Sequence, residues 1–111
     1  MKRFCFALDL IDDEVMIEEY KAHHRNFWPE LRQNAHNSGI KFLELYLSGN
    51  RLFMVQETED DFDPENETHQ QDSWLTQRFQ EWEELMARYQ KTIPSAKPGQ
   101  KWVLMEKIFE L

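Results

Sequence analysis

Three residues in the first third of the chain have the types and spacing needed to bind a sugar and transfer protons on it. Tyr20 and His24 are four residues apart, so they project from the same face of a helix, and Trp28 follows at the next such step. Aromatic rings can pack against the apolar C–H faces of a pyranose, and opening its hemiacetal ring requires proton transfer at two oxygens. Histidine titrates closest to neutral pH and can give or take such a proton. These three residues are therefore a candidate sugar site.

Each of these residues also has an ordinary structural explanation. A lone histidine on a helix is usually a surface or capping residue. The Trp28 side chain is expected to lie partly in the hydrophobic core and partly in the pocket. His23 adjoins His24 but points roughly 100° away from it on an ideal helix, which indicates a structural or rim position. We therefore predict a catalytic role for His24 and not for His23.

A strand and a helix must position this group. Residues 3–10 alternate apolar and polar side chains, which predicts a β-strand. Asp12 and Asp13 then supply an N-cap and an acidic first turn, and a helical pattern continues through His24. Pro29 disfavours helical backbone at the residue before it, so a break is predicted over residues 26–28.

The remaining elements follow from periodicity and turn residues. Pro29 can begin a second helical piece that reaches about Asn37, and Gly39 is expected to cap it. The other predicted elements are a hairpin of residues 40–47 and 51–58 around Ser48-Gly49-Asn50, a polar loop over 59–72, a helix over 73–90 and a final strand over 101–111. The helix is indicated by apolar residues at spacings of four and three, namely Leu75, Phe79, Trp82, Met86 and Tyr89.

The order β-α-β-β-α-β predicts a ferredoxin-like α+β fold, with the helices on one face of an antiparallel sheet. The predicted strands are apolar on both faces. In the second strand, one set is Ile40, Phe42 and Tyr46 and the other is Leu43, Leu45 and Leu47. A face open to water should be polar, so the second face is expected to be covered, most simply by a second copy of the chain. The pattern leaves open which set faces the helices.

Size and charge exclude several classes of protein. The 111 residues suffice for one domain, spanning 1–111, and leave no room for a separate cofactor domain. The net charge of −8 repels nucleic acid and anionic membrane surfaces. Cys5 is the single cysteine, and no apolar run approaches the roughly 18 residues of a membrane span. We therefore expect a cytoplasmic protein that binds neither nucleic acid nor membrane.

The candidate site also carries a family resemblance. Glu19-Tyr20, His24 and Trp28-Pro29-Glu30-Leu31 fit the pattern E-Y-x-x-x-H-x-x-x-W-P-E-L, which resembles that of the L-rhamnose mutarotase family. The element order, the length, Gly39, Tyr46-Leu47 and Gln77-Arg78 extend the resemblance over nearly the whole chain. It implies a dimeric α/β barrel of two ferredoxin-like protomers. It also implies an isomerase that interconverts the α and β anomers of a 6-deoxy-L-hexose without metal or cofactor.

The resemblance further implies residue roles. His24 would be the proton donor, and Tyr20 would bind the sugar. Family members also use a tyrosine in the second strand and a tryptophan pair in the second long helix, where this chain has Leu43 and Phe79-Gln80. These departures change what the pocket can stack against and hydrogen-bond, which implies a preference shifted, for instance, from L-rhamnose to L-fucose.

Two matters stay open at the level of sequence. The second proton-transfer group is not evident; Glu44 and Tyr20 are candidates, beside a bound water and the same imidazole acting in turn. Phe79 also fits simple packing, and Gln80 fits a solvated helix surface. The rival functions are an oxygenase on the same dimeric barrel, haem-dependent through His24 or cofactor-free, and a non-catalytic module that binds a small ligand.

Overall fold

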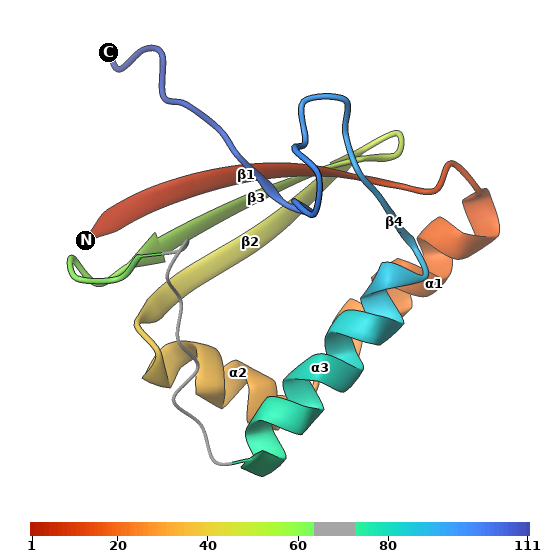
Figure 1. Ribbon diagram of the computed structural model, residues 1–111, viewed down its shortest axis with the longest axis horizontal. Coiled ribbons are helices and arrows are strands. Elements are labelled where there is room, and N and C mark those ends of the chain that lie inside the picture. Colours follow the sequence, from red (N-terminus) through yellow and green to blue (C-terminus); the bar gives the residue numbers. More distant parts are fainter. Residues whose placement is uncertain (64–72) are drawn as a thin grey trace.

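The structure, a computed structural model, describes residues 1–63 and 73–111, with the backbone alone described for residues 73–76. Its elements are β1 (Lys2–Leu10), α1 (Glu14–Arg25), α2 (Pro29–Asn37), β2 (Ile40–Ser48), β3 (Arg51–Thr58), α3 (Ser73–Ala87), β4 (Gln90–Lys91) and β5 (Val103–Leu104) (Figure 1). Most of the loop predicted over 59–72 lies outside the described residues, as does the side chain of Leu75. Within the described part of the chain, no helix is long and apolar enough to cross a membrane.

The helices that carry the candidate site begin where the sequence predicts. Asp13 is the N-cap of α1, and its side-chain oxygen accepts a hydrogen bond from the backbone N of Met16 at 3.0 Å. Pro29 occupies the first turn of α2, after the predicted break. Gly39 follows α2 with a φ of +107°, a conformation that residues with a side chain rarely adopt. The break and the glycine cap are confirmed.

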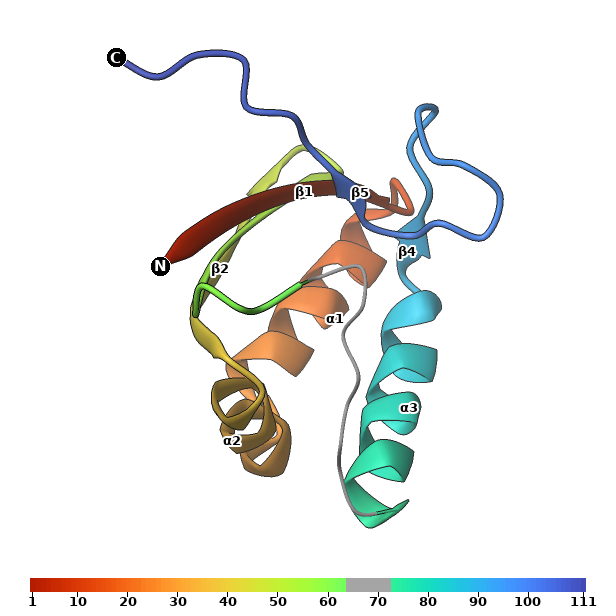
Figure 2. The same ribbon diagram turned by 60° about the vertical axis from the view of Figure 1, so that its left-hand side comes forward.

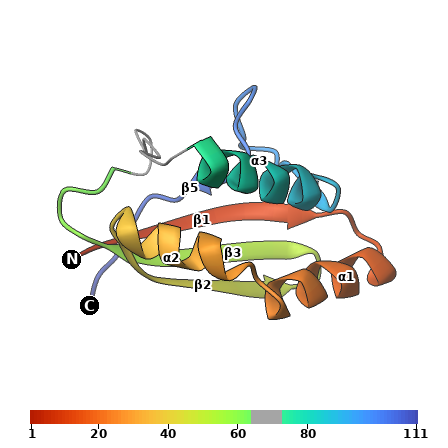
Figure 3. The ribbon, with the colours of Figure 1, turned by 90° about the horizontal axis from the view of Figure 1, so that it is seen from below.

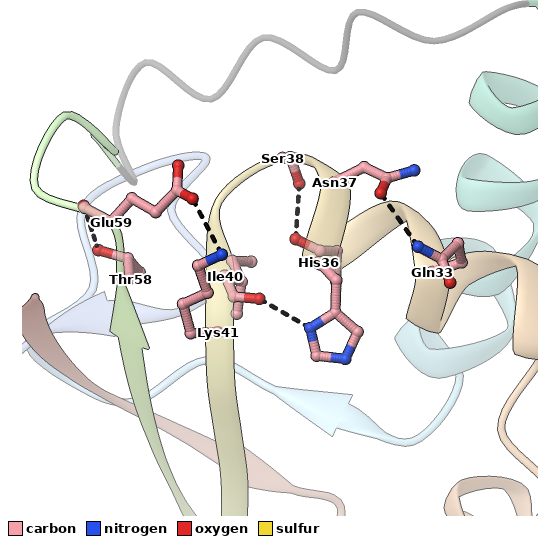
Figure 4. A network of polar contacts seen from close by, with 9 residues as sticks. Gln33, His36, Asn37, Ser38, Ile40, Lys41, Thr58 and Glu59 are labelled. Carbon is pink, nitrogen blue, oxygen red and sulfur yellow. Dashed lines mark hydrogen bonds and ion pairs between the residues drawn. The ribbon is translucent and has the colours of Figure 1, made fainter.

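Side chains fix the junction between α2 and β2 (Figure 4). His36 Nδ1 donates a hydrogen bond to the carbonyl oxygen of Ile40 at 3.0 Å. The next residue, Lys41, places its Nζ 3.0 Å from Glu59 Oε1, which ties the start of β2 to the end of β3. His36 is therefore part of the structural support at the start of β2.

β2 and β3 form the predicted hairpin, which turns at Gly49 with a φ of +60°. The pairing is shifted between Ile40 and Phe42, where β2 contains an irregularity of the β-bulge type. Because the bulge resets the alternation, the buried Ile40 shares the helix-facing side with Leu43. Grouping Ile40 with Phe42 and Tyr46 was therefore wrong, since a regular strand was assumed.

The strand order is β2-β3-β1-β4, with β5 also paired to β1, and every pair is antiparallel. This is the order of a ferredoxin-like β-α-β-β-α-β sheet, with its fourth strand reduced to short pairings at the edge of β1. The helices lie together on one side of the curled sheet (Figure 2). α3 runs along one side of this layer, and α1 with α2 runs along the other (Figure 3).

The last strand is shorter than the sequence predicts for 101–111. Only Val103–Leu104 pair with β1, and one further hydrogen bond joins Met105 N to Cys5 O at 2.7 Å. Beyond this point the chain leaves the sheet, and Ile108 is 87% exposed. Alternating apolar residues predict a strand equally well whether they pair within the protomer or lie on its surface, so the pattern could not fix the end.

The core lies between the sheet and the helices. Leu8 and Leu10 of β1 are almost fully buried, and Leu47 of β2 packs against this core. Tyr46 points to the opposite face of the sheet and is 55% exposed. Of the two apolar sets of β2, the one with Leu43, Leu45 and Leu47 therefore faces the helices.

Candidate active site

A cavity of about 620 Å³ lies between the helix-facing side of the sheet and the helices. This volume falls within the usual range for small-molecule sites. Four of the predicted site residues line it, namely Tyr20, His24, Leu43 and Phe79. The fold therefore brings residues from α1, β2 and α3 to one space, although they are far apart in the sequence.

His24 is held in one orientation by the backbone of its own helix. Its Nδ1 lies 3.0 Å from the carbonyl oxygen of Tyr20, one turn earlier. A carbonyl oxygen can only accept, so Nδ1 carries the hydrogen and Nε2 is left to exchange a proton. Burial lowers the pKa of His24, while the bond to the Tyr20 carbonyl opposes this and the nearby His23 adds to it. Neutral His24 therefore presents a lone pair at Nε2.

Tyr20 is buried beside this imidazole. Its ring centroid lies 4.6 Å from that of His24, and its hydroxyl oxygen accepts a hydrogen bond from Gln90 Nε2 at 3.3 Å. Burial raises the pKa of Tyr20 to about 12, against a lowering by the bond from Gln90, and the charge of Glu83 raises it further. The phenol is therefore protonated at neutral pH, and its own hydrogen is free to bond a ligand oxygen.

Trp82 of α3 is the centre of an aromatic wall of the cavity. The sequence predicted only that Trp82 belongs to the apolar side of this helix. Its ring stands edge-on to those of three neighbours. The centroid distances are 5.3 Å to His24, 4.9 Å to Phe27 and 5.2 Å to Trp28. Trp82 and Phe27 line the cavity as well. The wall joins α1 to α3 and limits the movement of the imidazole.

Trp28 supports this wall from behind. It is not among the residues that line the cavity, and it packs against the core cluster. The guanidinium of Arg78 lies 3.9 Å from the centroid of the Trp28 ring and also bonds Glu30 at 3.0 Å. The aromatic ring, the cation and the carboxylate thereby link α2 to α3.

Besides Trp28, two more predicted site residues do not line the cavity. Glu44 is on the opposite face of the sheet, where it accepts a hydrogen bond from the Tyr46 hydroxyl at 2.6 Å. Gln80 is exposed on α3, one residue beyond the cavity-lining Phe79. The Glu44 side chain points away from the cavity because it alternates along β2 with the leucines that face the helices. Gln80 does not reach the cavity because it lies outside the apolar side of α3. Neither is brought to Tyr20 and His24.

His23 serves the helix packing. Its Nε2 lies 3.2 Å from the Tyr89 hydroxyl, which in turn donates to Glu19 Oε1 at 3.5 Å. His23 does not line the cavity that holds His24. The two adjacent imidazoles therefore point to different surroundings, as their helical spacing predicts.

Further polar residues line the cavity that sequence reasoning missed. Gln56 of β3 is 5% exposed, and the amide of Gln90 has an Oε1 without a hydrogen-bond partner in the described structure. Glu83 of α3 lines the same space. The position of Glu83 four residues after Phe79 could have indicated it, since such residues share a helix face.

In residues 1–63 and 73–111, no three His, Cys, Asp or Glu side chains form a group able to hold a metal ion.

Comparison with known proteins shows which family the chain resembles. Residues 3–111 match the family model described as L-rhamnose mutarotase. The chain is 39% identical over 113 residues to the L-fucose mutarotase of Xanthomonas campestris pv. campestris, covering 100% of this chain and 89% of that protein. It is 33% identical to the L-rhamnose mutarotase of Paraburkholderia phymatum over 51 residues, which is 44% of this chain and 47% of that protein.

Solved structures show the same fold. The L-rhamnose mutarotase of Formosa agariphila superposes with a TM-score of 0.71 at 21% identity, covering 100% of this chain and 99% of that chain. The tetracenomycin F2 cyclase of Streptomyces glaucescens superposes with a TM-score of 0.58 at 17% identity, covering 100% and 97%. The resemblance drawn from Tyr20, His24 and Trp28-Pro29 is confirmed by the family match. The chain belongs to the L-rhamnose mutarotase family.

Proposed function

We propose that this protein is a mutarotase that interconverts the α and β anomers of a 6-deoxy-L-hexose. The observation that carries the proposal is the orientation of His24, whose Nε2 is left free beside the cavity by the Nδ1 bond to the Tyr20 carbonyl. Family membership supports the reaction class. The aromatic rings of Phe79 and Trp82 offer surfaces for the apolar C–H faces of a pyranose.

In this proposal His24 transfers the proton at the ring oxygen. Once protonated at Nε2, His24 gives this proton to the ring oxygen as the bond from that oxygen to C1 breaks, while a second group takes the proton of the anomeric hydroxyl. The open-chain aldehyde that results rotates about the C1–C2 bond. Reclosure on the other face of the aldehyde returns the proton to Nε2. The protonated phenol of Tyr20 donates a hydrogen bond to the sugar and holds it during the rotation. Trp28 contributes through the wall it forms with Trp82.

We further propose that the protein accepts L-fucose alongside L-rhamnose. The two sugars differ in hydroxyl orientation at C2 and C4, and the relative from Xanthomonas is named an L-fucose mutarotase. Leu43 and Phe79 line the cavity at places where family members have a tyrosine and a tryptophan. An aliphatic side chain in place of a hydroxyl-bearing one removes a hydrogen bond that discriminates between the sugars.

Substitution of the cavity residues tests the proposed acceptance of L-fucose alongside L-rhamnose. The double variant Leu43→Tyr with Phe79→Trp is expected to shift the rate ratio toward L-rhamnose by roughly one to two decades, because each buried polar mismatch is worth about 1–3 kcal/mol. Gln80→Trp is the control, since Gln80 lies outside the cavity. The measurement is saturation-transfer NMR of anomer exchange in both sugars. Strict L-rhamnose specificity in the unaltered protein would contradict the proposal.

We also propose that the active protein is a homodimer that joins the exposed sheet faces of two protomers. Tyr46 is 55% exposed on this face and lies beside Phe53, at 6.4 Å between ring centroids. Exposed aromatic side chains of this kind are typical of a protein surface that contacts another subunit.

A further inference from the structure

Opening a hemiacetal needs two proton transfers, and His24 accounts for one of them. The titratable side chains that line the cavity, among the described residues, are Tyr20, His24, Arg32, His36 and Glu83. Arginine stays protonated in proteins, and Tyr20 is a phenol at neutral pH because burial raises its pKa to about 12. His36 also keeps an unbonded Nε2, but it stands at the junction of α2 and β2 (Figure 4), and among the described residues no ring contact joins it to His24 or Trp82. Glu83 is the one carboxylate in this set.

Glu83 faces the site from the wall opposite the histidine. It belongs to α3, whereas His24 belongs to α1, and the two helices run along different sides of the helical layer (Figure 3). The residue before it, Trp82, stands edge-on to the His24 ring at 5.3 Å, so this turn of α3 is the part that approaches the imidazole. His24 and Glu83 thus line the same cavity from different helices, which lets them approach a bound sugar from different sides.

The carboxylate is fixed and yet has a free oxygen. Lys101 Nζ lies 3.0 Å from Glu83 Oε2 and holds the side chain in place. No hydrogen bond to Oε1 occurs within the described structure. The Glu83 side chain is 42% exposed, so a ligand in the cavity can reach it. Its charge also acts on the buried Tyr20, whose pKa is raised first by burial and then by Glu83.

We propose that Glu83 is the second proton-transfer group and acts together with His24; this rests on the proposed mutarotase function. In ring opening, the Glu83 carboxylate takes the proton of the anomeric hydroxyl, and the C1–O1 bond becomes a carbonyl. The electrons of the C1–O5 bond pass to O5, which takes the proton from His24 Nε2. In reclosure on the other face, O5 returns its proton to His24, and O1 regains its proton from Glu83. The pair thus carries one exchangeable proton in total, and no further reactant is consumed.

The test is the substitution Glu83→Gln, which keeps the size and polarity of the side chain and removes its basicity. The rate constant kcat for anomer exchange is expected to fall by about 10²–10⁴-fold, with KM little changed. Glu84→Gln is the matched control, because Glu84 is the next residue of α3, is exposed and does not line the cavity. Glu83→Asp, which keeps a carboxylate, is expected to recover part of the lost rate.

A pH profile separates proton transfer from a structural role. The wild-type pH profile of the exchange rate is expected to change shape in Glu83→Gln, because this variant lacks the basic side chain, and to keep its shape in the control Glu84→Gln. Unchanged kcat in a folded Glu83→Gln protein would overturn the inference while leaving the mutarotase function intact. A rise in KM alone would also overturn it, because it would show that Glu83 only binds the sugar. Absence of catalysed exchange in the wild type would overturn both proposals.

Discussion

At the scale of single residues, the carbonyl of Tyr20 decides which nitrogen of His24 can exchange a proton. The spacing of four residues predicts that the two side chains share a helix face, and the structure adds that the same spacing brings Nδ1 within 3.0 Å of the earlier carbonyl. One turn of helix thus supplies the sugar-binding phenol, the imidazole and the bond that orients it. The tautomer could not be predicted from residue types, since it depends on the side-chain rotamer.

Burial of His24 also makes a testable contribution to stability. Its pKa in the folded protein lies below the ordinary value of 6.5, chiefly through desolvation, so the unfolded chain binds a proton there at higher pH. The contribution is therefore fully present above pH 6.5 and is lost as the pH falls from 6.5 through the folded-state pKa. His24→Gln removes this dependence, so its Tm is expected to fall less than that of the wild type on acidification. Thermal denaturation across this window checks the difference, and equal losses of Tm would contradict it.

At the scale of elements, the sequence predicts best where a single residue dictates backbone geometry. Pro29 and Gly39 fixed the break and the end of α2, because proline and glycine restrict or permit particular φ values whatever surrounds them. The alternation of apolar and polar residues along a strand is a weaker guide to which side each residue faces. The irregularity between Ile40 and Phe42 shifts the side-chain parity of β2, and only the pairing with β3 reveals it. The pattern left open which side of this strand faces the helices, and Glu44, named as a candidate base, lies on the side that faces away from them.

Gly39 offers a direct test of the junction between α2 and β2. A Cβ at this position would lie 3.4 Å from the Phe62 ring, on a backbone with φ of +107°. Gly39→Ala is therefore expected to lower the free energy of unfolding by about 1–3 kcal/mol, measured by urea denaturation. Gly49→Ala is the comparison, because its φ is +60° and its Cβ would meet nothing within 4 Å. A loss at Gly39 no greater than that at Gly49 would contradict the argument from the backbone conformation at Gly39.

At the scale of the whole molecule, the active site could be predicted only in part because it is assembled from distant segments. Tyr20 and His24 share one helix, and their spacing revealed them. Trp82 and Glu83 reach the cavity because α3 lies on the same face of the sheet as α1, and Gln90 reaches it from β4, the strand after α3. The spacing of apolar residues predicts that α3 is an amphipathic helix, but it does not indicate which other elements pack against α3. Long-range packing therefore supplied the residues that sequence reasoning missed.

The sheet face opposite the helices predicts the oligomeric state. Phe53 lies at the middle of this face, with Ala7 and Tyr46 as its cross-strand neighbours. The wild type is expected to sediment as a dimer at micromolar concentration, and Phe53→Lys is expected to sediment as a monomer because it places a charge in the apolar interface. Val15→Lys is the control, since Val15 is 69% exposed on α1. A monomeric wild type would contradict the proposed dimer.

The central claim is that His24 transfers a proton that opens the sugar ring, and saturation-transfer NMR tests it directly. Irradiation of one anomeric proton of L-fucose or L-rhamnose should transfer saturation to the other anomer in the presence of the wild-type protein. His24→Ala is expected to lose this transfer by about 10²–10⁴-fold in rate while remaining folded, and His23→Ala is expected to keep most of it. Full exchange activity in a folded His24→Ala protein would contradict the account.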